Sequence, residues 1–459
     1  MDRGLFYLFV LMAATYCSVG AATGELPPGP QIDASVQDWL VTSGAPSASV
    51  AVVQNGVVTY AHAYGKAQLS PSMAATASTR YAVDSISKEF TAAAVLLLVQ
   101  DGKLSLDDRV EKWFPDLGDA SRVTVRQLLN HTSGIRDFWP QDFVPPEMLR
   151  PTTEEAIIAE WARRPLDFES GTQWQYSNTG YVLAAAVVEK ISHGTLMAFL
   201  QQHIFEPLKM EHVTEDDTHP LPAGDAVPYT RQGLGPARHA PKEGPGWLFG
   251  AGALAMTPSE LALWDISVMN RSLLAPASYE AMFEPVILKD GTRKDYGLGL
   301  DIQKVQGRTR IGHDGAGSGF LSAHRIWPDE KIAIIAVTNN DWATPDDLVN
   351  RIAFLVVPPN AAEARARAVF SQFQQGSIDR SLFTDNGNTL LTAQALSDLK
   401  GSLGPLGAPV LIDLQRESNR GGMVTRIWKI LCRSKRLLAI ERGYPNGKFE
   451  QFLVEQLND

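Results

Sequence analysis

The chain has 459 residues, of which 44% are hydrophobic and 20% are charged, a composition typical of a globular protein with a large core. This length suits one large domain with a smaller one beside it. The formal net charge of −10 argues against the basic surface that nucleic-acid-binding proteins carry, so no nucleic-acid partner is expected. The 9 histidines are scattered without an HExxH or Cys/His cluster, so neither a metal nor a cofactor is expected.

Residues 1–22 have the pattern of a secretory signal peptide. An apolar run over residues 5–14 follows a basic residue, and small residues lead up to Ala22. The run is too short for a comfortable membrane span, so we expect cleavage near Ala22, export to the periplasm or the medium, and no stable membrane span afterwards. An uncleaved anchor is one alternative, and a lipoprotein at Cys17 is disfavoured by the bulky tyrosine before it. Cys17 leaves with the signal, so Cys432 remains alone and no internal disulfide is expected.

The first predicted elements are a hairpin and a buried helix. Residues 47–65 alternate apolar with small or polar side chains around Asn55-Gly56, a dipeptide that favours a two-residue turn between antiparallel strands. A helix is predicted over residues 85–100, where Asp101-Gly102 ends it. Apolar residues surround this helix on nearly every side, which is typical of a helix at the centre of a large domain.

Helices dominate from about residue 120 to 285, the clearest being those predicted over 180–192 and 257–269. Strands return between residues 296 and 340. Strands at both ends with helices between them predict an α/β (α+β) domain over residues 30–357. It would have a mainly antiparallel sheet, flanked by helices, and a helical subdomain.

A separate unit is predicted after Pro358-Pro359, which interrupt regular structure. Residues 360–459 contain one helix over about 361–375 and four strands further on, as in a small α+β accessory domain. Its basic residues are expected on one solvated face of the sheet, with contact to an anionic wall polymer as the alternative. These residues are Arg426, Lys429, Arg433, Lys435 and Arg436.

Ser85 and Lys88 stand three residues apart at the head of the buried helix, and positions at this spacing share one helix face. A serine is a poor nucleophile unless a base activates it. A lysine in apolar surroundings has a lowered pKa and acts as that base when it is neutral. The motif alone has little specificity, because Ser397 and Lys400 repeat it in the tail, where we expect a solvated helix face.

Two further triplets strengthen the case for a catalytic serine. Tyr176-Ser177-Asn178 precedes a helix, and a tyrosine hydroxyl near an ammonium group loses its proton more easily and can relay protons. The alternative is an asparagine helix cap beside a packing tyrosine. His313-Asp314-Gly315 lies at a strand end, where glycine allows close approach of a ligand backbone; a glycine-rich turn with a surface histidine is the alternative.

The order Ser-x-x-Lys, Tyr-x-Asn and His-x-Gly resembles the beta-lactamase-related serine hydrolases, which include class C beta-lactamases, D-alanyl-D-alanine carboxypeptidases, D-aminopeptidases and esterases. The connecting segments "VTVRQLLNHTSGI", "IFEPLKM", "GAGALAMTPSELALW" and "YGLGL" are also similar to that family. The resemblance extends over about residues 30 to 357, and it implies a serine beta-lactamase-like fold. The tail resembles accessory domains of such hydrolases only in size and position.

The resemblance implies a role for each matching residue. Ser85 would be the acylated nucleophile, and Lys88 and Tyr176 would activate it and carry the proton to the leaving group. The implied substrate-binding residues are Asn178, His313, Gly315 and Ala316. The backbone N–H groups of Ser85 and Ala316 would form the oxyanion hole.

Three positions depart from the family pattern. His313 stands where lactamases usually carry the lysine of Lys-Thr-Gly, and a neutral histidine binds a carboxylate less firmly than lysine does. Ser170 replaces a proline that is common before the following glycine. Asp84 stands where a small residue is frequent, and we expect its side chain to point outward and at most to cap the helix.

The sequence therefore predicts an exported serine hydrolase that cleaves amide or ester bonds of a small-molecule or peptide substrate, as a peptidase of D-amino-acid or cell-wall peptides or as an esterase. The alternatives are a class C-like beta-lactamase and a non-catalytic homologue that binds cell-wall peptides or penicillin. An α/β-hydrolase is disfavoured because no serine has glycines at both flanking positions of G-x-S-x-G. The sequence does not indicate an oligomeric state.

Overall fold

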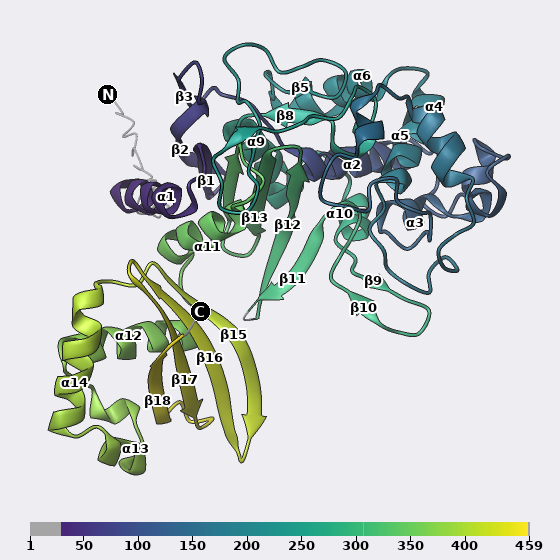
Figure 1. Ribbon diagram of the computed structural model, residues 1–459. Coiled ribbons are helices and arrows are strands. Elements are labelled where there is room, and N and C mark those ends of the chain that lie inside the picture. The colour runs from purple at the N-terminus through teal and green to yellow at the C-terminus, as the bar shows by residue number, and fades with distance from the viewer. Residues whose placement is uncertain (1–28, 306, 458–459) are drawn as a thin grey trace, which may run out of the picture.

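A computed structural model describes residues 29–305 and 307–457 of the chain (Figure 1), so the predicted signal peptide at residues 1–22 lies outside the described residues. The larger part is built around a seven-stranded sheet with the order β11-β12-β13-β14-β1-β2-β3, in which every neighbouring pair is antiparallel. Strands from both ends of this part thus meet in one sheet, as the sequence predicts. The strands are β1 (Ser47–Gln54), β2 (Val57–Gln68), β3 (Met73–Ala74), β11 (Asp301–Val305), β12 (Arg308–Gly317), β13 (Phe320–Trp327) and β14 (Ile332–Thr338).

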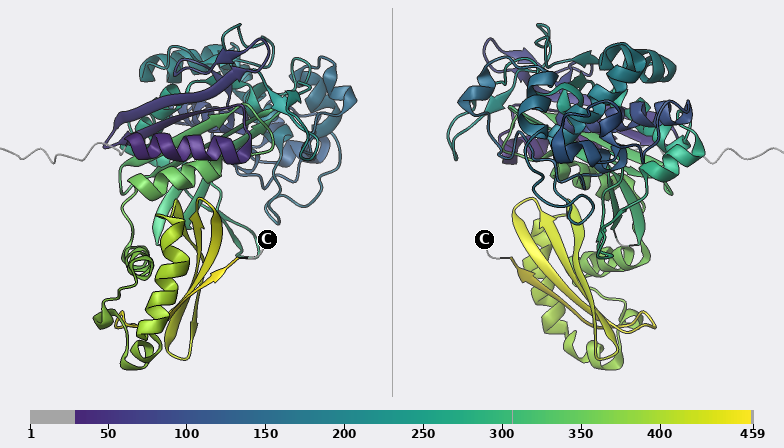
Figure 2. Two further views of the ribbon diagram at one scale, coloured as in Figure 1. Left: turned by 60° about the vertical axis from the view of Figure 1, so that its left-hand side comes forward. Right: turned by 90° about the vertical axis from the view of Figure 1, so that its right-hand side faces the viewer.

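Helices cover both faces of this sheet (Figures 1 and 2). On β1, Val50 and Val52 belong to the core beneath α1 and α11, whereas Ala51 and Val53 belong to the larger core around α2, α5 and α9. This alternation is the two-residue period of a strand that is buried on both faces. The helices named here are α1 (Gly29–Ser43), α2 (Ser87–Gln100), α5 (Asn178–Ser192), α9 (Pro258–Asn270) and α11 (Pro345–Val356).

The central helix begins later than predicted. A 3-10 turn, η1 (Asp84–Ile86), precedes α2, and neither has a side chain that caps its first turn. Asp84 therefore does not cap this helix. Most of α2 is buried, because its alanine, valine and leucine side chains lie in the larger core, where α2 contacts α5, α6 and α8.

The helical part lies at one end of the sheet, on the right in Figure 1, and packs around α5. Its further α-helices are α3 (Val125–Leu129), α4 (Glu154–Ile157), α6 (Leu196–Leu200), α7 (Glu206–Leu208), α8 (Phe249–Gly252) and α10 (Pro276–Met282). Three small sheets of short strands lie between these helices in the chain. The first consists of β4 (Tyr81–Ala82), β8 (Leu254–Met256) and β5 (Thr214–Glu215), in this order. The other two each have two strands: β6 (Tyr229–Thr230) with β7 (Arg238–His239), and β9 (Val286–Ile287) with β10 (Arg293–Lys294).

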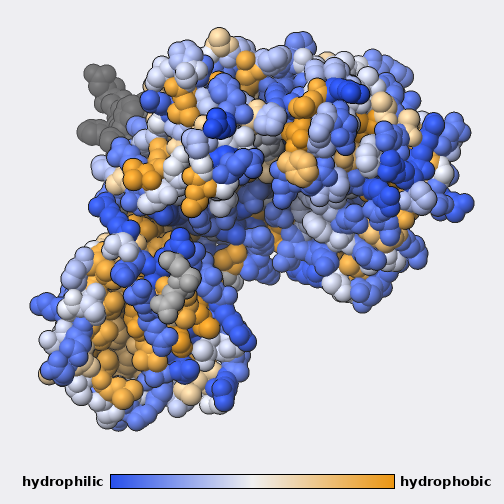
Figure 3. Space-filling view, in the orientation of Figure 1, coloured by the Kyte–Doolittle hydropathy of each residue, from blue (hydrophilic) through white to orange (hydrophobic). Residues whose placement is uncertain are grey.

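The tail forms a second lobe with its own hydrophobic core (Figures 2 and 3). Its antiparallel sheet has the order β15-β16-β17-β18, and Phe370 and Trp428 lie in the core between this sheet and the tail helices. Figure 3 shows apolar side chains gathered over the visible face of this lobe. The elements are α12 (Ala361–Gln375), α13 (Asp385–Leu390), α14 (Ala393–Leu403), β15 (Leu411–Arg420), β16 (Met423–Cys432), β17 (Lys435–Gly443) and β18 (Phe449–Gln456).

The basic residues of the tail do not share one solvated face. Arg426 is largely buried and pairs with the buried carboxylate of Glu441 at 2.7 Å, which also accepts a hydrogen bond from Trp428. Lys429 occupies an odd-numbered position of the same strand and so faces the opposite side. Within the described residues, no group of three or more His, Cys, Asp or Glu side chains has an arrangement for a metal ion.

Within residues 29–305 and 307–457, no single helix has both the length and the apolar composition to cross a membrane. One pair of helices, Asn178–Ser192 with Leu196–Leu208, has them together but is bent by 73°.

Candidate active site

The three sequence triplets converge on one cleft of about 950 Å³ between the sheet and the helical part. Ser85 comes from η1 before α2, Tyr176 from the loop before α5, Asn178 from the first position of α5, and His313 and Ala316 from β12. Tertiary structure thus brings together segments that lie more than two hundred residues apart. Of the remaining candidates, Lys88 lies buried behind Ser85, whereas Gly315 does not line the cleft.

The Lys88 amino group makes three polar contacts. Its Nζ lies 3.0 Å from Ser85 Oγ, 2.8 Å from Asn178 Oδ1 and 2.6 Å from the backbone carbonyl of Ala251. The amide oxygen and the carbonyl oxygen can only accept hydrogen bonds. A neutral amine has two hydrogens and one lone pair, so these two acceptors take both hydrogens and the lone pair faces the Ser85 hydroxyl group. In its neutral form, Lys88 is therefore placed to accept the serine proton.

Burial favours this neutral form. Lys88 is fully buried, and desolvation lowers the pKa of its amino group from 10.5 to about 7, although Asp137 and Asp84 raise it. A substantial fraction of the amine is thus unprotonated near neutral pH. The lowered pKa agrees with the expectation from an apolar environment.

Tyr176 differs from the sequence-based expectation. Its ring centroid lies 4.8 Å from Lys88 Nζ, and a nearby cation was expected to lower the pKa of its hydroxyl group. Burial instead raises that pKa well above its ordinary value, although the neighbouring Ser85 hydroxyl lowers it. Because its pKa is raised, the phenol group keeps its proton. Its buried oxygen has no well-aligned hydrogen bond to any described residue, so the hydroxyl group can donate or accept a hydrogen bond.

Asn178 is held in place by Asp137, a residue that the sequence patterns do not reveal. Asp137 accepts hydrogen bonds from the backbone N–H of Asn178 at 2.9 Å and from its side-chain Nδ2 at 3.1 Å. This fixes the amide so that Oδ1 faces Lys88. Asp137 is only 7% exposed and follows the "HTSGI" segment by two positions, but a single aspartate in a loop carries no recognisable signal.

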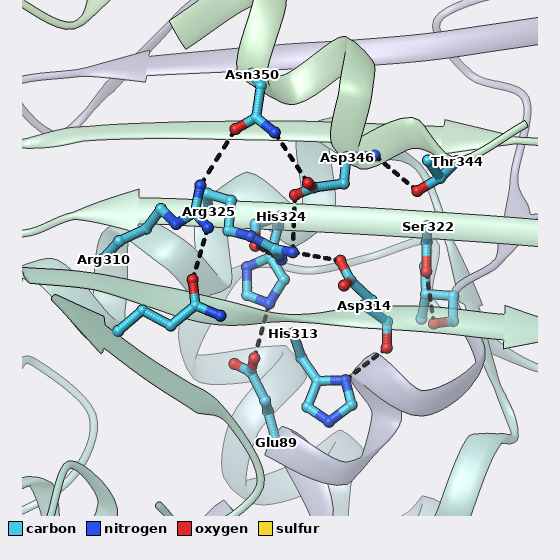
Figure 4. Close-up of polar contacts among 12 residues, drawn as sticks. Glu89, Arg310, His313, Asp314, Ser322, His324, Arg325, Thr344, Asp346 and Asn350 are labelled. Atoms are coloured by element: carbon cyan, nitrogen blue, oxygen red, sulfur yellow. Dashed lines mark hydrogen bonds and ion pairs between the residues drawn. The ribbon is translucent and has the colours of Figure 1, made fainter. Parts of the chain in front are cut away.

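His313 is buried, and both of its ring nitrogens are engaged. Nε2 lies 3.0 Å from the hydroxyl oxygen of Tyr296, and Nδ1 lies 2.5 Å from the backbone carbonyl of Asp314, as Figure 4 shows for the latter contact. Burial and then the nearby Lys88 lower the pKa of His313 to about 3, so the ring is neutral. The surface histidine considered as an alternative is therefore wrong, because His313 is 5% exposed.

The expected roles of Gly315 and Asp84 need correction. A Cβ atom at Gly315 would lie 2.1 Å from both the Val83 carbonyl oxygen and the Ser322 hydroxyl oxygen, so this glycine makes room for the turn that carries Ser85 rather than for a substrate. The Asp84 side chain was expected to point outward, yet it is 4% exposed and packs against Gly317. Burial, followed by repulsion from other carboxylates, raises the pKa of Asp84 well above its ordinary value.

A buried ion cluster joins α2 to its neighbours, and Figure 4 shows its contact between Glu89 and His324. His324 Nε2 is 2.7 Å from Glu89 and Nδ1 is 2.8 Å from Asp265, and all three side chains are fully buried. Carboxylates only accept hydrogen bonds, so both ring nitrogens carry hydrogens and His324 is an imidazolium. Although burial opposes this charge, the two carboxylates raise the pKa of His324 to about 10. The cluster ties α2 to β13 and α9 beside Lys88.

The described lining of the cleft carries acidic and aromatic side chains but no lysine or arginine. The aromatic residues lie on two loops of the helical part. The acidic residues are Asp84, Asp137, Asp142, Asp314 and Asp341, and the aromatic group from these loops consists of Phe138, Trp139, Phe143 and Trp247.

Comparison with known proteins identifies the family. The Beta-lactamase family model matches residues 32–356. The chain is 27% identical over 309 residues to "Penicillin-binding protein 4*" of Bacillus subtilis (strain 168), covering 64% of this chain and 68% of that protein. It is 29% identical over 304 residues to a D-aminopeptidase of Brucella anthropi, covering 64% of this chain and 56% of that relative. The chain thus spans less than two thirds of that D-aminopeptidase.

Solved structures show the same fold. A D-stereospecific amidohydrolase from Streptomyces sp. superimposes with a TM-score of 0.63 at 27% identity, covering 73% of this chain and all of that one. An octameric penicillin-binding protein homologue from Pyrococcus abyssi has a TM-score of 0.64 at 21% identity and covers 94% of this chain and 96% of that one, a likeness in fold alone. The predicted fold class is confirmed. The chain belongs to the beta-lactamase family of serine hydrolases.

Proposed function

We propose that this protein hydrolyses amide or ester bonds through an acyl-enzyme on Ser85. The observation that carries the proposal is the position of the Lys88 amine, whose lone pair faces Ser85 Oγ when its two hydrogens bond to Asn178 and Ala251. A buried base with a pKa of about 7 takes up the serine proton at neutral pH without a metal ion or a histidine.

In the proposed reaction, Lys88 removes the hydroxyl proton while Ser85 Oγ attacks the carbonyl carbon. The negative charge on the carbonyl oxygen is held by the backbone N–H groups of Ser85 and Ala316. The proton passes from the lysine to the leaving group, with the neutral phenol of Tyr176 as the intermediate carrier, and the bond to the leaving group breaks. Water then attacks the acyl-enzyme with Lys88 again as base, which releases the acid and restores Ser85.

The charge of the cleft favours substrates that carry an amino group or no charge. The described residues of the lining include no lysine or arginine, so a substrate carboxylate would meet no cation of the lining there. The aromatic residues favour an apolar side chain next to the reacting carbonyl group. Similarity to a D-aminopeptidase and a D-stereospecific amidohydrolase supports amides, esters or peptides of D-amino acids. We place the class C-like beta-lactamase second, because penicillins carry a carboxylate.

Labelling by a fluorophosphonate probe tests the nucleophile. We expect a covalent adduct on Ser85 that Ser85→Ala abolishes, while Ser397→Ala, in the second Ser-x-x-Lys copy on the exposed face of α14, retains it. Hydrolysis of D-phenylalanine amide, nitrocefin and p-nitrophenyl acetate by the same three proteins then ranks amide, lactam and ester substrates. A fully folded protein that forms no adduct and turns over none of them would instead be a non-catalytic binding homologue.

We also infer that the protein is exported, on the signal-like pattern of residues 1–22. Expression of the full chain in a Gram-negative host, followed by fractionation and mass measurement of the mature N-terminus, tests this. Cleavage near Ala22 in the periplasmic fraction is expected. A cytoplasmic protein of full mass would contradict export, and a membrane-bound protein of full mass would identify the uncleaved anchor.

A further inference from the structure

A hydrogen-bonded row of three buried side chains runs alongside the cleft. His131, at the end of α3, has Nε2 at 3.2 Å from the hydroxyl oxygen of Tyr296, and that oxygen lies 3.0 Å from Nε2 of His313. The three residues are at most 5% exposed. The row connects the helical part with β12, and the proposed reaction does not use it.

Backbone groups at its two ends determine the direction of every hydrogen bond in this row. The backbone N–H of Ser177 donates to Nδ1 of His131 at 3.1 Å, so the hydrogen of the neutral His131 ring is on Nε2 and is donated to Tyr296. Tyr296 therefore donates its own hydrogen to Nε2 of His313. His313 then carries its hydrogen on Nδ1, which donates to the Asp314 carbonyl oxygen. The two histidines are thus held in opposite tautomers.

We propose that Tyr296 is a specificity-determining residue that excludes substrate carboxylates from the β12 edge of the cleft, because its hydroxyl group occupies Nε2 of His313. This inference rests on the proposed hydrolysis at Ser85. His313 lines the cleft but has no free N–H group, since its one hydrogen is bound to a backbone carbonyl group. A carboxylate needs a donor, and Tyr296 leaves none on the His313 ring.

The surroundings of His313 keep it in this state. A protonated His313 would carry hydrogen on Nε2, and the Tyr296 hydroxyl group could then no longer donate its own hydrogen to that nitrogen. The row therefore opposes protonation of His313. The other titratable or charged groups that face the ring are Lys88 on α2, Tyr176 before α5, Asp314 on β12, and His324 and Arg325 on β13, where His324 is directly opposite in the strand register. The charges of His324 and Arg325, and that of Lys88 when it is protonated, add to the repulsion.

Nitrogen NMR of protein labelled with ¹⁵N-histidine tests the geometry directly. In the wild type at pH 7 we expect one buried histidine with hydrogen on Nε2 (His131) and one with hydrogen on Nδ1 (His313), assigned with His131→Gln and His313→Gln. In Tyr296→Phe, the Nε2 resonance of His313 shifts because this nitrogen no longer accepts a hydrogen bond and can carry the ring hydrogen. Identical tautomers in the wild type, or an unchanged resonance in the variant, would overturn the proposal.

A matched pair of esters tests specificity. The acetate esters of 3-hydroxybenzamide and 3-hydroxybenzoate differ only in the charge of the leaving group. In Tyr296→Phe, Nε2 of His313 no longer accepts a hydrogen bond, so it can carry hydrogen and donate it to a substrate carboxylate. Relative to the wild type, we therefore expect Tyr296→Phe to raise the carboxylate-to-amide ratio of kcat/KM by about tenfold, the effect of one added polar contact. Tyr279→Phe removes another buried hydroxyl group, bonded to Ser267 and away from the cleft lining, and is expected to leave the ratio unchanged.

The outcomes separate this inference from the proposed function. Hydrolysis that depends on Ser85 but shows the same ratio in the wild type and Tyr296→Phe would refute the role of Tyr296 alone. A ratio raised equally by Tyr279→Phe would also refute it, since loss of packing would then explain the change. If neither ester acylates Ser85 in any variant, the proposed function fails and this inference falls with it.

Discussion

Replacing Lys88 by methionine should make the free energy of unfolding less dependent on pH while abolishing acylation. Lys88 is fully buried, and its folded-state pKa of about 7 is far below the ordinary lysine value of 10.5. Methionine has a similar length and no charge, so it removes the titrating group and largely fills its volume. The structure thus predicts a residue that costs stability and is retained for its chemistry.

The magnitude follows from the pKa shift. Each pKa unit is worth about 1.4 kcal/mol, so burying the protonated amine costs about 5 kcal/mol well below pH 7. Because the folded state binds fewer protons than the unfolded state, the free energy of unfolding of the wild type rises with pH between about 7 and 10.5. Lys88→Met lacks this rise. The free energy of unfolding of Lys88→Met minus that of the wild type should therefore fall by about 2–3 kcal/mol between pH 6 and pH 9.

A second effect of the substitution does not depend on pH. The carbonyl oxygen of Ala251 and the amide oxygen of Asn178 lose their donor, which costs about 1–3 kcal/mol for each buried group. The absolute difference at any one pH therefore mixes two terms of opposite sign. The change of that difference with pH isolates the titration of Lys88.

Urea unfolding followed by circular dichroism at pH 6, 7.5 and 9 measures this change. Lys400→Met is the matched control, because Lys400 is the exposed lysine of the second Ser-x-x-Lys copy, and its difference from the wild type should be the same at each pH. If the difference between Lys88→Met and the wild type is equally constant from pH 6 to 9, Lys88 is protonated in the folded protein and the reasoning is refuted.

Three further changes test other parts of the structure. Asp137→Asn removes a carboxylate that raises the pKa of Lys88, so the acid limb of the pH profile of kcat/KM should move to lower pH, by about one unit; a shift to higher pH would contradict this. Gly315→Ala brings a Cβ atom to 2.1 Å from the Val83 carbonyl oxygen, so we expect a loss of stability of about 1–3 kcal/mol and slower Ser85 labelling. Deleting residues 360–459 should leave labelling intact but alter stability or substrate range, because the tail has a separate core; a folded truncation without labelling would disprove it.

The glycine prediction has a control in the same chain. Gly401 lies within α14, and a Cβ atom added there meets no atom within 4 Å. Gly401→Ala should therefore leave labelling unchanged and stabilise the helix by about 0.5–1 kcal/mol. If Gly315→Ala and Gly401→Ala label Ser85 at the same rate, close packing at Gly315 does not position Ser85.

Periodicity and turn residues were sufficient to predict most of the architecture. The alternation in residues 47–65 and the return of strands before residue 340 reflect local side-chain patterns, and these patterns persist in β1, β2 and β11–β14. The helix over residues 361–375 was predicted correctly because a proline pair precedes it and a glycine follows its last turn. The true start of α2 was missed, since η1 is shaped by its contact with β12 rather than by a cap.

Other predictions were wrong because the surroundings of a side chain are formed by residues far away in the sequence. The orientation of Asp84 depends on the space beside Gly317, more than two hundred residues later. The raised pKa of Tyr176 follows from its burial, which no triplet reveals. The basic residues of the tail are separated onto different sides of the sheet because Arg426 pairs with the buried Glu441.

The sequence by itself determined the nucleophile–base pair as candidates, because Ser85 and Lys88 share a helix face at local spacing, and it indicated the family through the order of the three triplets. Only the tertiary structure decided how these side chains are oriented and charged. Burial favours the neutral state of Lys88, Asp137 fixes the amide of Asn178, and the Tyr296 hydroxyl group bonds to the ring nitrogen of His313 that carries no hydrogen. The physical reason is that solvation and hydrogen-bond direction depend on groups brought together by folding, whereas periodicity depends on neighbours along the chain.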